Sequence, residues 1–141
     1  MLEVTLIIAA GIISSVRNLG ELGFPLWLNI LGGFLILGSS IFHIVTERVH
    51  KQSHDAHEDI NKIVDTGIYG VIRHPLYLSL IIRNLGFALA FGTIIPFILF
   101  GLSMVHWILS IEQEEKTLIN LLPDYQNYRQ KVRWKLVPGI Y

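Results

Sequence analysis

The feature that most constrains this chain is the stretch 24–45, which contains no Asp, Glu, Lys or Arg. As an α-helix rising about 1.5 Å per residue, the stretch is roughly 33 Å long, and the hydrocarbon core of a bilayer is about 30 Å thick. Small residues such as Gly32 and Gly33 suit close helix packing in lipid. The stretch therefore predicts a transmembrane helix and argues against a water-soluble globule.

Charge is distributed unevenly along the chain. Eleven basic and eleven acidic side chains occur in 141 residues, and most of them lie in 46–75 and 112–141. This balance gives no electrostatic reason to expect a nucleic-acid partner. The sequence has no cysteine, which excludes a disulfide framework, a thiolate metal site and a cysteine nucleophile. A small integral membrane protein is predicted.

Two further regions are apolar enough to enter the bilayer. Residues 2–16 are apolar apart from Glu3 and form a short predicted span. Residues 76–111 are too many for one crossing and about right for two short ones. Gly92 and the residues after it favour a reversal, which predicts a helical hairpin of about 76–91 and 94–111.

These spans predict an all-α polytopic membrane protein with about four transmembrane helices. Residues 1–45 would form two N-terminal transmembrane helices, and 46–141 a second region, which comprises a loop, the hairpin 76–111 and a C-terminal tail. All Lys and Arg residues except Arg17 and Arg83 fall in the two polar segments. The positive-inside rule then predicts that both termini and the loop are cytoplasmic.

Two polar clusters flank the predicted hairpin. Pro75 disfavours helical angles at His74, so the third span should begin at the proline, where free backbone N–H groups can meet an anion. Glu112, Glu114 and Glu115 follow the last span. Carboxylates at a helix C-terminus oppose the helix dipole. Either the helix continues into the tail, or a carboxylate is held there for a purpose.

Taken together, the clusters resemble the isoprenylcysteine carboxyl methyltransferases and their relatives, the phospholipid N-methyltransferases. The resemblance covers about residues 61–138, just over half of the chain. Each motif is weak alone, and the ordered combination at hairpin spacing is specific. The motifs are Gly67-x-Tyr69, Arg73-His74-Pro75-x-Tyr77, Glu114-Glu115-x-x-Leu118 and Asp124-Tyr125-x-x-Tyr128.

The resemblance implies that 46–141 is a catalytic region, with an S-adenosylmethionine pocket in the cytoplasmic C-terminal part of the chain. The positions it assigns to cofactor binding are Asn61, Lys62, Ile63, Val64, Gly67, Tyr69, His74, Pro75, Leu76, Tyr77 and Glu114. The faces of Tyr69 and Tyr77 could hold the sulfonium by cation–π attraction of about 0.5–2 kcal/mol. Glu114 could pair with the ammonium group of the cofactor. Tyr125 and Tyr128 would help to close the site.

The sequence departs from the isoprenylcysteine enzymes at a substrate position. The arginine that they carry four residues before the first Glu of E-E-x-x-L is Ser110 here. Arg83 lies inside the third predicted span, where a charge costs at least about 2.5–3.5 kcal/mol. We hypothesise that Arg83 replaces the missing arginine as receptor for a carboxylate or phosphate; pairing with a lipid phosphate, or snorkelling, is the alternative. His106 could assist an amine acceptor, and Arg83, His106 and Ser110 form the predicted catalytic group.

The acceptor is predicted to be a lipophilic or lipidated molecule, because a site between membrane helices gives an apolar tail lateral access. The carboxylate of an isoprenylcysteine-like molecule is the first choice, and a phospholipid amine or a small hydrophobic thiol stays open. The Gly-rich second span could also pair with a copy of itself.

Two other functional classes remain open. A membrane reductase of the sterol-reductase type would bind NADPH, although such chains are normally longer. A non-enzymatic membrane subunit would leave the clustering of His74, Tyr77 and Glu114 unexplained, since polar groups are costly at membrane depth.

A histidine cluster precedes the catalytic motifs. His50, His54 and His57 recur at helical spacing and could place three imidazoles on one face. A solvated His-rich helix needs no metal for its stability, so no metal site is predicted.

Overall fold

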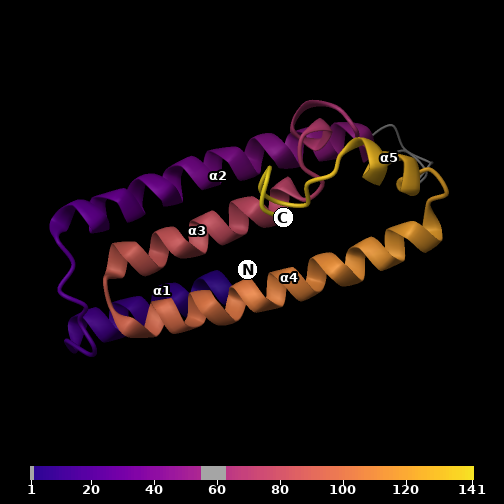
Figure 1. The fold of residues 1–141 in the computed structure, drawn as a ribbon. Coiled ribbons are helices and arrows are strands. Elements are labelled where there is room, and N and C mark those ends of the chain that lie inside the picture. Colours follow the sequence, from indigo (N-terminus) through magenta and orange to yellow (C-terminus); the bar gives the residue numbers. More distant parts are fainter. Residues whose placement is uncertain (1, 55–62) are drawn as a thin grey trace. The chain divides into compact units, whose positions relative to one another are not determined.

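The computed structural model describes residues 2–54 and 63–141, and these residues are helical with short connections (Figure 1). The elements are α1 (Leu2–Val16), α2 (Leu26–His54), the 3-10 helix η1 (Gly67–Gly70), α3 (Pro75–Phe91), α4 (Ile94–Leu121) and α5 (Tyr125–Lys131). The predicted all-α class is confirmed. Two compact units are present, one built from 2–41 and 79–107 and the other from 42–54, 63–78 and 108–141.

The predicted spans correspond to helices. The predicted span 2–16 is α1, and the hairpin reverses between α3 and α4 at Gly92, whose φ is 62°. Two segments are long and apolar enough to cross a membrane, Leu26–Val49 and Ile94–Leu121, whereas α1 and α3 are shorter apolar helices. Four crossings and their orientation therefore stay a prediction.

Both long helices exceed the predicted spans. The span predicted for 24–45 corresponds to the first part of α2, which begins at Leu26 and continues to His54. The span predicted for 94–111 is the first part of α4, which continues to Leu121. The acidic cluster therefore lies within a helix, and its carboxylates do not face the negative end of the helix dipole directly.

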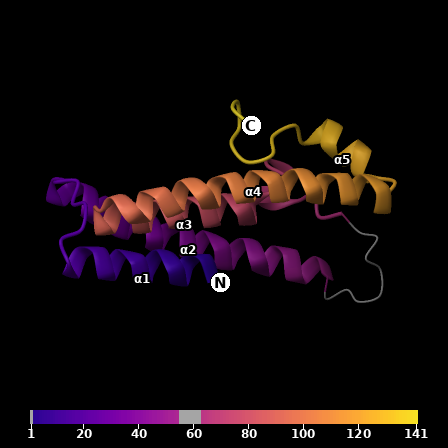
Figure 2. The same ribbon diagram turned by 90° about the horizontal axis from the view of Figure 1, so that it is seen from below.

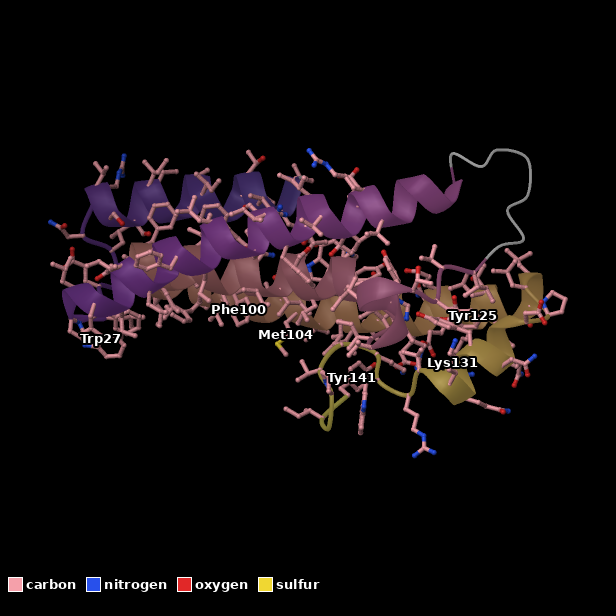
Figure 3. The ribbon with its side chains drawn as sticks, turned by 90° about the horizontal axis from the view of Figure 1, so that it is seen from above. Trp27, Phe100, Met104, Tyr125, Lys131 and Tyr141 are labelled. Carbon is pink, nitrogen blue, oxygen red and sulfur yellow. The ribbon has the colours of Figure 1, made fainter. Side chains whose placement is uncertain are left out.

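The first unit leaves large apolar side chains uncovered. Trp27, Phe34 and Leu37 on α2 are 62%, 67% and 64% exposed. The labelled side chains of Trp27 and Met104 project outward from their helices (Figure 3). Contiguous apolar surface of this kind is unfavourable in water. A lipid environment would suit this apolar surface.

Backbone contact between α2 and α3 holds the first unit together. A Cβ atom placed on Gly32 would lie 2.6 Å from the carbonyl oxygen of Gly86 and 2.5 Å from the amide nitrogen of Ala90. Asn29 donates hydrogen bonds to the carbonyls of Leu89 and Ala90, at 3.1 and 3.0 Å. Small residues thus allow the close packing predicted for Gly32, whereas Gly33 faces open space.

In the second unit, α5 turns back from the end of α4 (Figure 2). Its core is formed by apolar and aromatic side chains from α4, α5 and the loop before η1. The buried members are Leu122, Tyr125, Tyr128 and Val132, with Ile63, Leu118 and Ile119 packed against them.

The C-terminal tail pairs with the segment that leads into α3. A parallel bridge joins Ile72 to Trp134. The amide of Arg73 donates to the carbonyl of Trp134, and the amide of His74 donates to that of Lys135, both at 2.9 Å. The backbone at the start of α3 is thereby held by the tail.

Candidate functional site

The Arg73 side chain occupies the centre of the second unit. Its Nε donates to Glu115 Oε1 at 2.6 Å, and its Nη1 donates to the carbonyls of Val132 and Arg133, at 2.7 Å each. Both charged side chains are 4% exposed. A buried ion pair is stable when further hydrogen bonds satisfy its members, and the tail carbonyls meet that requirement for the guanidinium.

Glu115 is surrounded by donors in addition to Arg73. His74 Nε2 lies 3.1 Å from Oε1, and the Tyr125 hydroxyl donates to the same oxygen at 3.4 Å. Arg129 Nε lies 3.4 Å from Oε2. The carboxylate on α4 therefore joins the segment that leads into α3 to α5, and its hydrogen-bonding capacity is taken up by the protein itself.

Glu114, the preceding residue, is placed differently. Its Oε2 accepts a hydrogen bond from the Tyr77 hydroxyl at 2.6 Å, and the side chain is only half-buried. Successive residues on a helix point about 100° apart, so α4 directs one carboxylate to Arg73 and the next to Tyr77. Glu114 is thus the carboxylate that could still bind a ligand.

Tyr69 on η1 belongs to the same cluster. Burial, together with the negative charge of Glu114, raises the pKa of Tyr69 from 10.0 to about 12. Its carbonyl accepts a hydrogen bond from the Tyr128 hydroxyl at 2.8 Å. The His74 ring meets the Tyr77 ring edge-on, with centroids 5.8 Å apart. A carboxylate and aromatic rings at the start of α3 suit a small cationic ligand.

The other predicted cofactor positions are distributed around this cluster. Pro75 opens α3, as predicted, and Leu76 in the same turn is half-buried. Ile63 packs against the core of the second unit. Val64 is half-buried, and Gly67 begins η1 with open space around it.

Some predicted residues lie outside the part of the chain that is described. Asn61, Lys62 and His57 fall in the undescribed segment, and the side chains of His50 and His54 are likewise outside it. Within the described residues, no group of three or more His, Cys, Asp or Glu side chains could hold a metal ion.

The three predicted catalytic residues do not all belong to the second unit. Ser110 on α4 does, and it is half-buried there. Arg83 and His106 belong to the first unit. His106 Nε2 lies 3.6 Å from Glu3 Oε1, and its side chain is 60% exposed.

A second set of contacts ties the tail to α4. Lys135 Nζ and the Tyr141 hydroxyl both hydrogen-bond to Glu112 Oε1. Tyr141 is visible on the looped end of the tail (Figure 3). On the other side of the unit, Lys131 Nζ pairs with Asp65 at 2.8 Å, and this contact lowers the pKa of Asp65.

Comparison with known proteins identifies the family. A family profile described as phospholipid methyltransferase matches residues 27–124. The chain belongs to this family. The match contains all of α3 and α4, and with them Arg73, Tyr77, Glu114 and Glu115. The resemblance predicted from the motifs is confirmed.

A curated relative of this phospholipid methyltransferase family member is the protein-S-isoprenylcysteine O-methyltransferase of Schizosaccharomyces pombe. It is 32% identical over 97 residues, which cover 67% of this chain and 38% of the relative. The chain therefore matches well under half of the relative's length.

Sequence reasoning missed several members of the network. Arg73 and Glu115 were part of the recognised motifs and received no role, although the adjacency of Arg73 to His74 and of Glu115 to Glu114 was a signal. Arg129 gave no such signal, because its contact depends on how α5 folds back.

The first prediction concerns Glu115. Replacing it with Ala should leave the Arg73 guanidinium buried without its anion and destabilise the second unit by about 3–5 kcal/mol. Denaturant unfolding of the purified protein, followed by circular dichroism, measures the change. The matched variant Glu114→Ala should have a much smaller effect, and equal stabilities of the two variants would contradict the assigned roles.

The second prediction concerns alkaline pH. Burial raises the pKa of Tyr69 from 10.0 to about 12, and burial also raises the pKa of Tyr125 and Tyr128. A raised pKa in the folded state stabilises the fold fully below the unfolded pKa near 10. That contribution should be lost as pH rises from 10 through 12. Phenolate absorbance and helical circular dichroism, recorded together, should therefore change together; ionisation of the tyrosines near pH 10 with unchanged helix content would refute this.

Proposed function

We propose that this protein is a membrane methyltransferase that uses S-adenosylmethionine and methylates a lipophilic acceptor. The supporting observation is the cluster that joins the start of α3 to the acidic part of α4. Arg73, His74 and Tyr77 contact Glu115 or Glu114 within one unit, although about 40 residues separate the two motifs. The family match and its curated relative point to the same chemistry.

The two carboxylates suit different tasks in this proposal. Glu115 contacts four side chains and would hold the segments that form the site in position. Glu114 is half-buried, and the Tyr77 hydroxyl leaves part of its hydrogen-bonding capacity unused. We assign Glu114 to the ammonium group of the cofactor. Tyr69 and Tyr77 would present aromatic faces to the sulfonium.

The bound cofactor supplies a methyl group on a positively charged sulfur. The residues of the chain would bind it, orient it toward the acceptor and exclude water. Orientation is the main requirement, because methyl transfer needs an in-line approach of the acceptor atom. A carboxylate acceptor needs no base, and an anionic acceptor loses charge during transfer, which a dry site favours.

The family and the apolar helices support a lipophilic acceptor. The relative's name makes the carboxylate of an isoprenylcysteine-like molecule the first candidate. The family description points to phospholipids, so a phospholipid amine is the second candidate, and a small thiol the third. Ser110 stands where the isoprenylcysteine enzymes carry an arginine, so the acceptor's anion would need another receptor. Four crossings, with the site and both termini cytoplasmic, complete the proposal.

Cofactor binding is tested first. Calorimetry of the purified full chain should show binding of S-adenosylmethionine and none of NADPH. Glu114→Gln should weaken binding about tenfold, the value of one charge-assisted hydrogen bond. His74→Ala should also weaken it, while Gln113→Ala, an exposed neighbour on α4, should bind as the wild type does. Binding of NADPH, or wild-type affinity in both site variants, would overturn the assignment.

Methyl transfer is tested in membranes that contain the protein and methyl-labelled S-adenosylmethionine. A labelled lipophilic product that requires His74 is expected. Base-labile label indicates a methyl ester, label in a phospholipid headgroup indicates an amine acceptor, and label on sulfur indicates a thiol. The absence of any labelled product above that of a His74→Ala control would contradict the proposal.

A further inference from the structure

Arg83 is a charged side chain on α3 that makes no hydrogen bond or ion pair with any residue the structure describes. Its Nε is buried and has no hydrogen-bond partner there. It is the single Asp, Glu, Lys or Arg residue of α3. The first unit contains two acidic residues, Glu3 and Glu21, and neither forms an ion pair with Arg83.

The Arg83 side chain is half-buried, and an anion would satisfy its guanidinium. Its guanidinium stays protonated at any ordinary pH, and within a membrane span an unpaired charge costs at least about 2.5–3.5 kcal/mol. The planar guanidinium presents paired N–H groups that match a carboxylate or phosphate. The described part of the first unit supplies no such group to Arg83, and a bound molecule that carries a carboxylate or phosphate would fit this chemistry.

Other polar atoms in the first unit also lack partners. Asn84 is 1% exposed and donates from Nδ2 to Ser103 Oγ at 3.2 Å, and this leaves its Oδ1 buried without a partner. Glu3 Oε2 is buried without a partner as well. Both of these atoms are acceptors and would pair with a donor, whereas the unpaired Nε of Arg83 is a donor and is the group that can bind an anion.

We propose that Arg83 is the receptor for the oxyanion of an apolar-tailed molecule bound against the first unit. The oxyanion is a carboxylate or a phosphate. The tail would lie on the uncovered apolar surface of this unit, to which Leu37, Ile98 and Leu102 contribute with exposures of 64%, 55% and 63%. The inference stands on contacts of the first unit and does not depend on methyl transfer.

The experiment compares charged and uncharged probes of the same apolar length. The full chain, purified in a neutral detergent, is titrated with the fluorescent fatty acid cis-parinaric acid and with its methyl ester. The carboxylate should bind about tenfold more tightly than the ester. Arg83→Leu should abolish this preference. Arg83→Lys, which keeps the charge without the planar fork, should retain part of it.

Controls separate the site from general surface charge. Arg17→Leu removes an exposed cation of the same unit and should keep the wild-type preference. Displacement of the probe by phosphatidic acid, and not by phosphatidylcholine, would identify a phospholipid phosphate as the ligand; displacement by fatty carboxylates alone would identify a lipophilic acid. Equal affinity of the wild type for the acid and the ester overturns the proposal without any variant, and so does an unchanged preference in folded Arg83→Leu protein.

Discussion

The second unit depends on one buried carboxylate. Glu115 pairs with Arg73 at 2.6 Å, and the same guanidinium holds the carbonyls of Val132 and Arg133. Three segments that are distant in the sequence are thereby fixed to one another, since a buried charge that loses its partner is strongly unfavourable. The ion pair favours one arrangement of the helices and the tail.

Two adjacent glutamates on α4 are suited to different roles, one structural and one in ligand binding. A site for a charged ligand requires rigid surroundings together with a polar group that still has capacity to bind. The 100° turn between Glu114 and Glu115 separates these requirements spatially. Glu115 is satisfied by Arg73, His74, Tyr125 and Arg129, whereas Glu114 is held by one hydroxyl and partly exposed. The cluster is therefore organised before any ligand arrives, and a ligand need not break the ion pair to bind.

The sequence predicted those features of the fold that depend on the residue types of a short segment. Apolar length located α1, and the stereochemistry of proline located the start of α3 at Pro75. The reversal at Gly92 was found because its residue types favour a turn. Residue types and spacing leave open whether α4 continues through the acidic cluster, because the groups that pair with its carboxylates come from distant segments. The same limit explains why Glu115, and not Glu114, contacts His74: the rotation of a helix relative to its neighbours is not encoded in spacing alone.

The family profile ends at position 124, yet the Arg73 site is completed beyond it. The partners that the tail supplies to Arg73 are backbone groups. Arg73 donates to the carbonyls of Val132 and Arg133, and the amides before α3 donate to those of Trp134 and Lys135. Every residue has a carbonyl group, so these contacts require only that the backbone passes close to Arg73 and do not require particular side chains. A tail of different sequence could therefore supply the same carbonyls to Arg73, whereas Arg73 and Glu115 have no such freedom because their side chains make the contact.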